Sequence, residues 1–191
     1  AEQDLNAKTR HIPKVVIPAS IHMDHFDEKI AIIGAGPAGL TAAFYLAETG
    51  YRPTVFEKSE HPGGMLRYGI PSYKLEKDLL DAEIDVAKAM GVEIKTGIEV
   101  GKDVTIQQLR EQGYKAFYIA IGCAAGRLPG LENENAEGVM TAIDYLHDAN
   151  CGNAPFAGKV VVVGGGNVAI DASRVSARNA ASSVFQFSLE Q

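Results

Sequence analysis

Apolar runs and helical periodicities alternate along the chain from Lys29 onward. Residues 30–33 are all apolar, which is typical of a strand buried on both faces, and a helical stretch follows to about Thr49. Residues 54–56 predict a second strand. Strand, helix and strand in this order predict a βαβ unit with two parallel strands.

The chain between this unit and Gly122 predicts further helices and strands. Apolar residues at helical spacing, with Lys and Asp on the opposite face, predict an amphipathic helix over 75–90. Thr105 and Gln108 have the spacing of a capping box, which predicts the start of a short helix. Short apolar or alternating segments predict strands at 92–95, 99–100 and 115–121.

A strand and a helix repeat this arrangement later in the chain. Residues 159–163 are apolar and lead into three glycines, and a helical stretch continues to about Arg178. A first glycine motif, GAGPAG at 34–39, follows the strand at 30–33. Gly164 stands 130 positions after Gly34, so the two motifs are in register, and Ala169 stands where the first motif has its third glycine. A duplicated dinucleotide motif predicts two bound dinucleotides and hydride transfer between them.

The first motif, GAGPAG, has the residues that a dinucleotide pyrophosphate requires. Gly34 permits the tight turn, Gly36 lets the backbone approach the phosphates, and Gly39 lets helix and strand pack closely. The helix N-terminus adds free N–H groups and a positive dipole end. Glu57, 23 positions after Gly34, can accept both hydroxyls of a ribose. That acid disfavours the alternative, in which the glycines serve only a tight turn.

Composition and charge exclude several classes of protein. With 18 Lys and Arg against 24 Asp and Glu, the 191-residue chain has a net charge of −6, which argues against binding to nucleic acid or an anionic membrane. No apolar run reaches the roughly 20 residues of a membrane span, and no signal peptide is recognisable, so we expect a cytoplasmic protein. Cys123 and Cys151 are too few for a disulfide scaffold, a zinc site or an iron–sulfur cluster.

Residues 1–27 are expected to form an extended arm, because prolines and charges interrupt any period. His22, Asp24 and His25 resemble metal ligands, but such triplets are common in polar arms and no fourth ligand stands nearby. We therefore predict no metal site.

Four runs of sequence are distinctive. They are GAGPAGL at 34–40, GGMLRYGIPSYKL at 63–75, YIAIG at 118–122 and VVVGGGNVAID at 161–171. Together they resemble the glutamate synthase small-subunit family of flavoproteins, which is similar to the flavin and NADPH portion of dihydropyrimidine dehydrogenase. The similarity covers about residues 29–190, and the GGxLRYGIP part is the most specific, because flavoproteins with two dinucleotides in general have the other runs.

The resemblance implies an α/β fold with a doubly wound, parallel, Rossmann-like FAD-binding domain over 28–150. Residues 151–191 would begin an NAD(P)-binding domain, as an incomplete second dinucleotide-binding βαβ unit. Hydride would pass from NADH or NADPH to FAD, and electrons would continue to iron–sulfur or flavin centres of a partner. Residues 57–73 contain no cysteine, which removes thiol–disulfide chemistry, and we predict no catalytic side chain.

The same resemblance implies which residues contact each nucleotide. Those at the FAD pyrophosphate and ribose are Gly34, Gly36, Pro37, Ala38, Gly39, Glu57 and Lys58, with Val100 at the adenine and Ala120 and Gly122 on the far side of the pyrophosphate. Those beside the flavin are Gly64, Met65, Leu66 and Arg67; Arg67 could offset negative charge on a reduced flavin, the alternative being a solvated surface arginine. Those at the nicotinamide nucleotide are Gly164, Gly165, Gly166, Asn167, Val168, Asp171 and Glu190.

The C-terminal residues lead to two further expectations. The second unit stops shortly after its second strand, so we expect a fragment of a larger flavoprotein, with the iron–sulfur domain or large-subunit partner elsewhere. The alternative function is a nucleotide-binding fragment without turnover. Family members that use NADPH tend to place two arginines where Leu189 and Glu190 stand, and a carboxylate repels a 2′-phosphate, so NADH is favoured. In the alternative, Glu190 is only a solvated residue.

Overall fold

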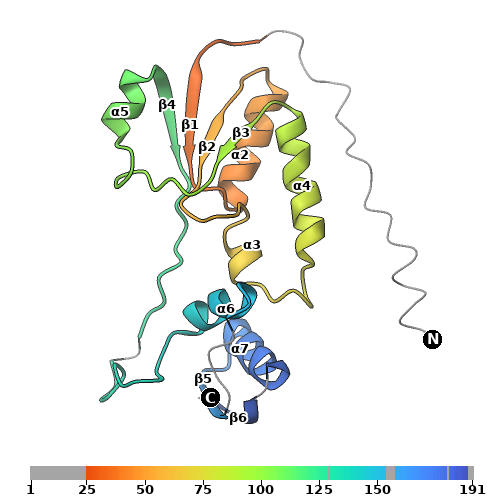
Figure 1. Cartoon of the computed structure of the whole chain (residues 1–191), viewed down its shortest axis with the longest axis vertical. Helices are drawn as coiled ribbons and strands as arrows, with labels where there is room; N and C mark the ends of the chain where they lie inside the picture. Colours follow the sequence, from red (N-terminus) through yellow and green to blue (C-terminus); the bar gives the residue numbers. More distant parts are fainter. Residues whose placement is uncertain (1–24, 129, 154–157, 180, 189–191) are drawn as a thin grey trace, which may run out of the picture. The chain divides into compact units, whose positions relative to one another are not determined.

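The computed structural model describes residues 25–188 except 129, 154–157 and 180 (Figure 1). The described chain forms two compact units. Unit 1 contains the described residues up to Pro62 together with Lys77–Ile121, and unit 2 contains Gly63–Glu76 and the described residues from Gly122 onward. The division differs from the expected boundary at residue 150 in two respects: Gly63–Glu76 belongs to the second unit, and so do residues 142–150, which pack on Ala172 and Val175.

Unit 1 is built on a parallel sheet of four strands in the order β3-β2-β1-β4. The expected strand at 99–100 does not form, because Val100 makes only an isolated bridge with Val104. The expected strand at 115–121 also ends earlier, at Ile119. The four strands are β1 (Lys29–Ile33), β2 (Thr54–Phe56), β3 (Glu93–Lys95) and β4 (Tyr114–Ile119).

Helices cover both faces of this sheet, as the doubly wound prediction requires. On one face, Ile32 and Val55 pack in a core with residues of α2 (Pro37–Glu48) and α4 (Lys77–Ala89). On the other face, Ala31 and Phe56 pack with Leu109 of α5 (Ile106–Glu111). Successive strand residues point to opposite faces, so the continuous apolar run of β1 serves two cores at once.

The capping box at the start of α5 forms as predicted. The Thr105 hydroxyl accepts a hydrogen bond from the Gln108 backbone N–H at 3.1 Å, and the Gln108 side-chain oxygen accepts one from the Thr105 N–H at 2.8 Å. Replacing Thr105 with alanine is expected to lower the free energy of unfolding by about 1 kcal/mol. Denaturant titration measures this loss; Thr105→Ser is the matched control, and an unchanged midpoint in Thr105→Ala would contradict the role.

Unit 2 contains a parallel pair of strands, β5 (Gly158–Val163) and β6 (Ala181–Phe187), with α7 (Asn167–Arg178) between them in the chain. Two elements that the hydrophobic pattern did not predict complete it, α3 (Met65–Tyr68) and α6 (Ala142–Asn150). A cap at Thr141, whose hydroxyl accepts from the Asp144 N–H at 3.2 Å, is the sequence signal that would have located α6.

The small sheet of unit 2 has apolar side chains on both faces. The helix α7, which follows β5, packs in turn through Ala172 and Val175 against α6. Among the described residues, the exposed apolar side chains of these strands are Val161, Val163, Phe185 and Phe187, each more than half exposed. One helix therefore covers only one face, in agreement with an incomplete second βαβ unit. No helix in the described ranges is long and apolar enough to cross a membrane.

Candidate dinucleotide sites

Two glycines of the first motif are required by the chain itself. Gly34 has φ +104°, and a Cβ placed on it would lie 2.3 Å from the carbonyl oxygen of Ala120. A Cβ on Gly39 would lie 1.9 Å from the carbonyl oxygen of Gly34. Both contacts are far below van der Waals distance, so any side chain at either position would displace backbone. The turn between β1 and α2 is thus closed by packing against the end of β4.

Gly36 differs from Gly34 because its backbone φ is in the range that any residue adopts. It caps α2 with φ −79° and ψ −175°, an extended conformation that other residues adopt. No side chain caps this helix, and no acidic residue stands in its first turn. Pro37 begins the helix, where its missing N–H costs nothing. Ala38 is the next residue of the helix. The N-terminus of α2 therefore offers its unpaired N–H groups and its positive dipole end to an anion.

Glu57 lies at the end of β2 and is 6% exposed. One of its carboxylate oxygens accepts a hydrogen bond from the Ala35 N–H at 2.7 Å, and the other accepts from the Ser59 N–H at 2.8 Å. Each oxygen of a carboxylate has a second lone pair, so both remain able to accept a hydroxyl. The bond to Ala35 connects Glu57 directly to the glycine turn, so the structure brings these two predicted features together.

The remaining residues of the predicted FAD set are distributed over both units. Ala120 donates its N–H to the Ile33 carbonyl at 2.8 Å, which holds the end of β4 beside the end of β1. Lys58 is exposed and Val100 is partly buried. Gly122, with φ +68°, and the run Gly64, Met65, Leu66 and Arg67 belong to unit 2.

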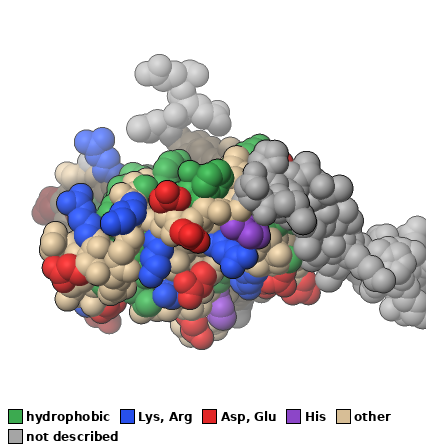
Figure 2. All heavy atoms as spheres, turned by 90° about the horizontal axis from the view of Figure 1, so that it is seen from above, with side chains coloured by type: hydrophobic (Ala, Val, Ile, Leu, Met, Phe, Trp, Pro, Cys, Tyr) green, Lys and Arg blue, Asp and Glu red, His purple; other side chains and the backbone are tan. Residues whose placement is uncertain are grey.

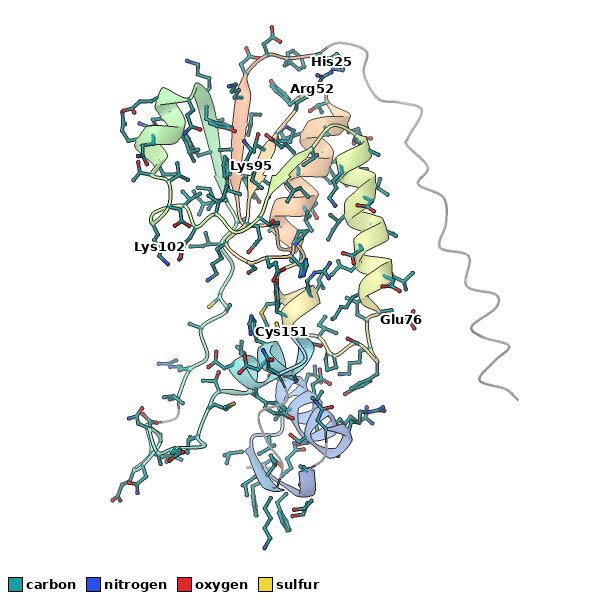
Figure 3. All side chains as sticks on the ribbon, viewed as in Figure 1. His25, Arg52, Glu76, Lys95, Lys102 and Cys151 are labelled. Carbon is teal, nitrogen blue, oxygen red and sulfur yellow. The ribbon has the colours of Figure 1, made fainter. Side chains whose placement is uncertain are left out.

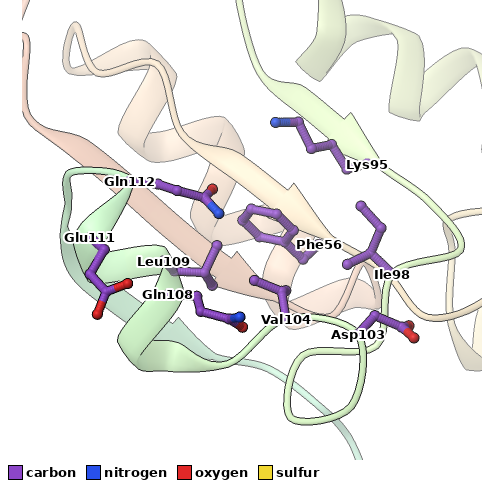
Figure 4. Close-up of a pocket in the computed structure, with 9 residues that line it drawn as sticks. All are labelled: Phe56, Lys95, Ile98, Asp103, Val104, Gln108, Leu109, Glu111 and Gln112. Atoms are coloured by element: carbon purple, nitrogen blue, oxygen red, sulfur yellow. The ribbon is translucent and has the colours of Figure 1, made fainter.

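A cavity of about 580 Å³ lies elsewhere in unit 1, on the face of the sheet that α5 covers. Its apolar lining consists of Phe56, Ile98, Val104 and Leu109, and charged residues such as Lys95 lie around it (Figure 4). No residue of the glycine turn lines it, and neither does Glu57. The cavity is therefore separate from the predicted dinucleotide site.

The second glycine turn repeats the construction of the first. Gly164 has φ +133° and donates its N–H to the Phe187 carbonyl at 2.7 Å, as Gly34 donates to Phe56 at 2.8 Å. Gly166 caps α7 with φ −75° and ψ 170°, again without a side-chain cap. A Cβ on Gly166 would meet no atom within 4 Å, so the space in front of α7 is open.

Around this turn the structure places the other residues predicted for the nicotinamide nucleotide. Gly165 packs closely, since a Cβ on it would lie 2.8 Å from the Ser188 Cβ. Asn167 is the first residue of α7, and Val168 beside it is 47% exposed. Glu190 lies outside the described residues.

Asp171, in contrast, is buried, with 8% of its surface exposed. Its carboxylate forms an ion pair with Lys74 and lies 3.5 Å from the Tyr73 hydroxyl. These partners belong to the GGMLRYGIPSYKL run, which sequence reasoning did not connect with Asp171. The run approaches α7 after a turn in which Gly63 and Gly64 both have positive φ.

Figure 2 shows the charged side chains on one face of the molecule. Lys and Arg side chains are intermixed with Asp and Glu side chains on this face, without a continuous field of one sign.

Comparisons with known proteins agree with this construction. The chain is 48% identical over 161 residues to the NADP(+)-dependent formate dehydrogenase subunit beta of Moorella thermoacetica, covering 82% of this chain and 23% of that protein. It is 38% identical over 169 residues to the glutamate synthase (NADPH) small chain of Escherichia coli K12, covering 82% and 36%. Among solved structures, a mutant of FprA from Mycobacterium tuberculosis matches with TM-score 0.66 and 26% identity, over 77% of this chain and 36% of that one.

The chain thus spans between 23% and 36% of the length of these two curated relatives. The similarity to the glutamate synthase small chain confirms the resemblance drawn from the four sequence runs. Residues 28–185, which include both glycine turns and Glu57, match a single family description. The chain belongs to the pyridine nucleotide-disulphide oxidoreductase family.

Proposed function

We propose that this protein is a flavoprotein oxidoreductase unit in which hydride passes from a nicotinamide nucleotide to FAD. The observation that supports the proposal best is the pair of equivalent glycine turns. Each turn ends in an uncapped helix N-terminus, at Gly36 and at Gly166. Two such sites in one chain suit two dinucleotides, one of which donates the electrons that the other accepts.

The residues of the first turn fit FAD. The uncapped N-terminus of α2 would bind the pyrophosphate, with Gly36 leaving room for the phosphate oxygens. Glu57 would accept the ribose hydroxyls with the lone pairs that Ala35 and Ser59 leave unused. The isoalloxazine ring, when bound, supplies an acceptor for two electrons. Residues Gly64, Met65, Leu66 and Arg67 are proposed to lie beside it.

The residues of the second turn fit a nicotinamide nucleotide. The open space at Gly166 admits a pyrophosphate against the first N–H groups of α7. Gly164 and Gly165 hold the backbone in the narrow turn behind it, and Asn167 and Val168 form the rim. In the reaction, NADH or NADPH loses a hydride and the flavin gains two electrons and a proton, so charge and atoms balance.

The nucleotide that purifies with the protein tests this assignment. Heat denaturation followed by chromatography is expected to release FAD at about one per chain, because the first glycine turn and Glu57, which would bind the pyrophosphate and the ribose, are both present. Release of FMN, or failure to retain FAD after incubation with an excess of it, would overturn the proposal.

The final electron acceptor is proposed to belong to a partner. Residues 57–73 contain no cysteine, and the two cysteines of the chain, Cys123 and Cys151, are 28 positions apart, so this chain does not provide the thiols of a redox-active pair or of a cluster. Two of the similar proteins are named as a subunit and as a small chain. We propose a partner with iron–sulfur or flavin centres.

NADH is proposed as the preferred donor, on the basis of Glu190. A carboxylate at the end of the second strand accepts from the 2′- and 3′-hydroxyls and repels a 2′-phosphate. The two relatives described above have NADP(+) or NADPH in their names, so this preference would distinguish the chain from them.

We expect kcat/KM for NADH to exceed that for NADPH by about tenfold or more, at 1.4 kcal/mol per tenfold. Steady-state rates measure the ratio: Glu190→Arg should shift it towards NADPH, and an equal or higher kcat/KM for NADPH in the unaltered protein would contradict the preference.

A further inference from the structure

One cluster in unit 2 connects the GGMLRYGIPSYKL run to the helix of the second glycine turn. Lys74 is paired with the Asp171 carboxylate, whose Oδ1 atom also lies 3.5 Å from the Tyr73 hydroxyl. The Arg178 guanidinium lies 4.4 Å from the centre of the Tyr73 ring, within the range of a cation–π contact. These four residues, Tyr73, Lys74, Asp171 and Arg178, are called here the Asp171 clamp.

The middle of the run is held within the same unit, at Tyr68. The Tyr68 ring, in α3, stacks on the His147 ring of α6 with centroids 4.9 Å apart. Asn150, the last residue of α6, donates from its side-chain amide to the Tyr68 carbonyl at 2.9 Å. Because α6 packs on α7 through a buried apolar cluster, the middle and the C-terminal end of the run are held by one pair of helices. In Figure 3, Glu76 marks where the run leads into α4.

The burial of Asp171 explains why its carboxylate needs the other residues of the clamp. Its side chain is only 12% exposed, whereas that of Lys74 is 39% exposed. A carboxylate at this depth needs a cation or hydrogen-bond donors, since an unpaired buried charge is costly. Asp171 is also placed four residues after Asn167, about 6 Å along the helix axis from the start of α7. The clamp therefore fixes Lys74 about one turn behind the proposed pyrophosphate site.

We infer that the Lys74–Asp171 pair positions the Gly63–Tyr68 run with respect to the N-terminus of α7. This inference rests on the proposed function, in which that run lies beside the flavin and α7 receives the nicotinamide nucleotide. Lys74 and Asp171 are positioning residues, because neither is proposed to touch the reacting atoms. Hydride transfer is sensitive to donor–acceptor distance, and a displacement of about 1 Å can cost about 100-fold in rate.

The test compares variants of the clamp with a matched ion pair in unit 1. Lys74→Met and Asp171→Asn each remove the ion pair, whereas Lys74→Arg conserves it. The double variant Lys74→Asp with Asp171→Lys reverses the two charges. Lys88→Met is the control, because the Lys88–Asp85 pair, at 2.9 Å, is on the exposed surface of α4. Each FAD-loaded protein is mixed with NADH without oxygen, and the limiting rate of flavin reduction is recorded. The apparent Kd for NADH and the FAD content are measured as well.

We expect Lys74→Met and Asp171→Asn to lower the limiting rate about 10-fold to 100-fold, while FAD content changes less than about threefold in both variants and the NADH Kd changes less than about threefold in Lys74→Met. The long-wavelength absorption that a nicotinamide gives when stacked on a flavin should weaken in the same variants, which a purely structural role would not cause. Lys74→Arg and the reversed pair should restore part of the rate. If Lys74→Met does not fold, the isosteric Asp171→Asn still provides the test.

Two kinds of result separate the possible failures. Unchanged rates and unchanged absorption in the clamp variants, or a loss equal to that of Lys88→Met, would overturn the inference alone. If the unaltered protein binds FAD but NADH and NADPH do not reduce this flavin, the proposed function is overturned, and the inference with it.

Discussion

Replacing Gly36 with valine is expected to remove FAD from the protein while unit 1 stays folded. The Gly36 backbone is extended, so valine can adopt it, and the change at the cap costs only about 1 kcal/mol of stability. Its side chain would occupy the space in which the pyrophosphate must approach the N–H groups of α2. We expect flavin affinity to fall at least about 100-fold, which corresponds to about 2.7 kcal/mol.

Gly166→Val is the matched change in the second turn. Gly166 has almost the same backbone conformation and open space around its Cβ direction, so this variant should also fold. It is expected to retain FAD and to lose binding of the nicotinamide nucleotide. Flavin content and titration with NADH measure the two effects separately. Loss of both nucleotides in either variant, or of neither, would contradict the assignment of one nucleotide to each turn.

Gly39→Ala is expected to damage the fold itself. The added Cβ would lie 1.9 Å from the Gly34 carbonyl oxygen and 3.2 Å from the Ile32 side chain, both in the tightest part of unit 1. Such a contact forces α2 away from β1, and we expect the free energy of unfolding to fall by about 3 kcal/mol. Thermal or denaturant unfolding of the flavin-free protein measures the loss, so the effect is not confused with loss of the ligand.

Ala169→Gly provides the comparison for this prediction. Ala169 occupies the equivalent position in the second turn. A Cβ placed on Gly164 would lie 3.4 Å from the Ala169 Cβ, which is an ordinary van der Waals distance. The second turn therefore does not need the third glycine. Replacing Ala169 should cost only the helix propensity of glycine, about 1 kcal/mol. Equal losses in Gly39→Ala and Ala169→Gly would contradict this difference between the turns.

The sequence predicted those parts of the fold that depend on neighbouring residues. A strand buried on both faces is a continuous apolar run, so β1, β2 and β5 could be located, and the capping box at Thr105 follows from residues three positions apart. The position of Glu57 beside the glycine turn could also be predicted, because a strand and helix of known length separate them.

Contacts between distant residues could not be predicted in this way. Tyr73 and Asp171 are 98 positions apart, and neither hydrophobic periodicity nor turn chemistry indicates their contact. The four residues of α3 are too few to show a helical period, so the run from Gly63 to Glu76 was assigned by position in the chain rather than by its packing. The packing of α6 on α7 is likewise a contact between distant residues, and it places α6 in unit 2, before the expected boundary at residue 150.

Anaerobic mixing of the FAD-loaded protein with NADH or NADPH tests the central claim most directly. The account predicts that the visible absorption of the flavin bleaches, with one flavin reduced for each nicotinamide nucleotide oxidised. A flavin that stays oxidised at saturating concentrations of both nucleotides would contradict the claim, and would identify the chain as a nucleotide-binding fragment without turnover.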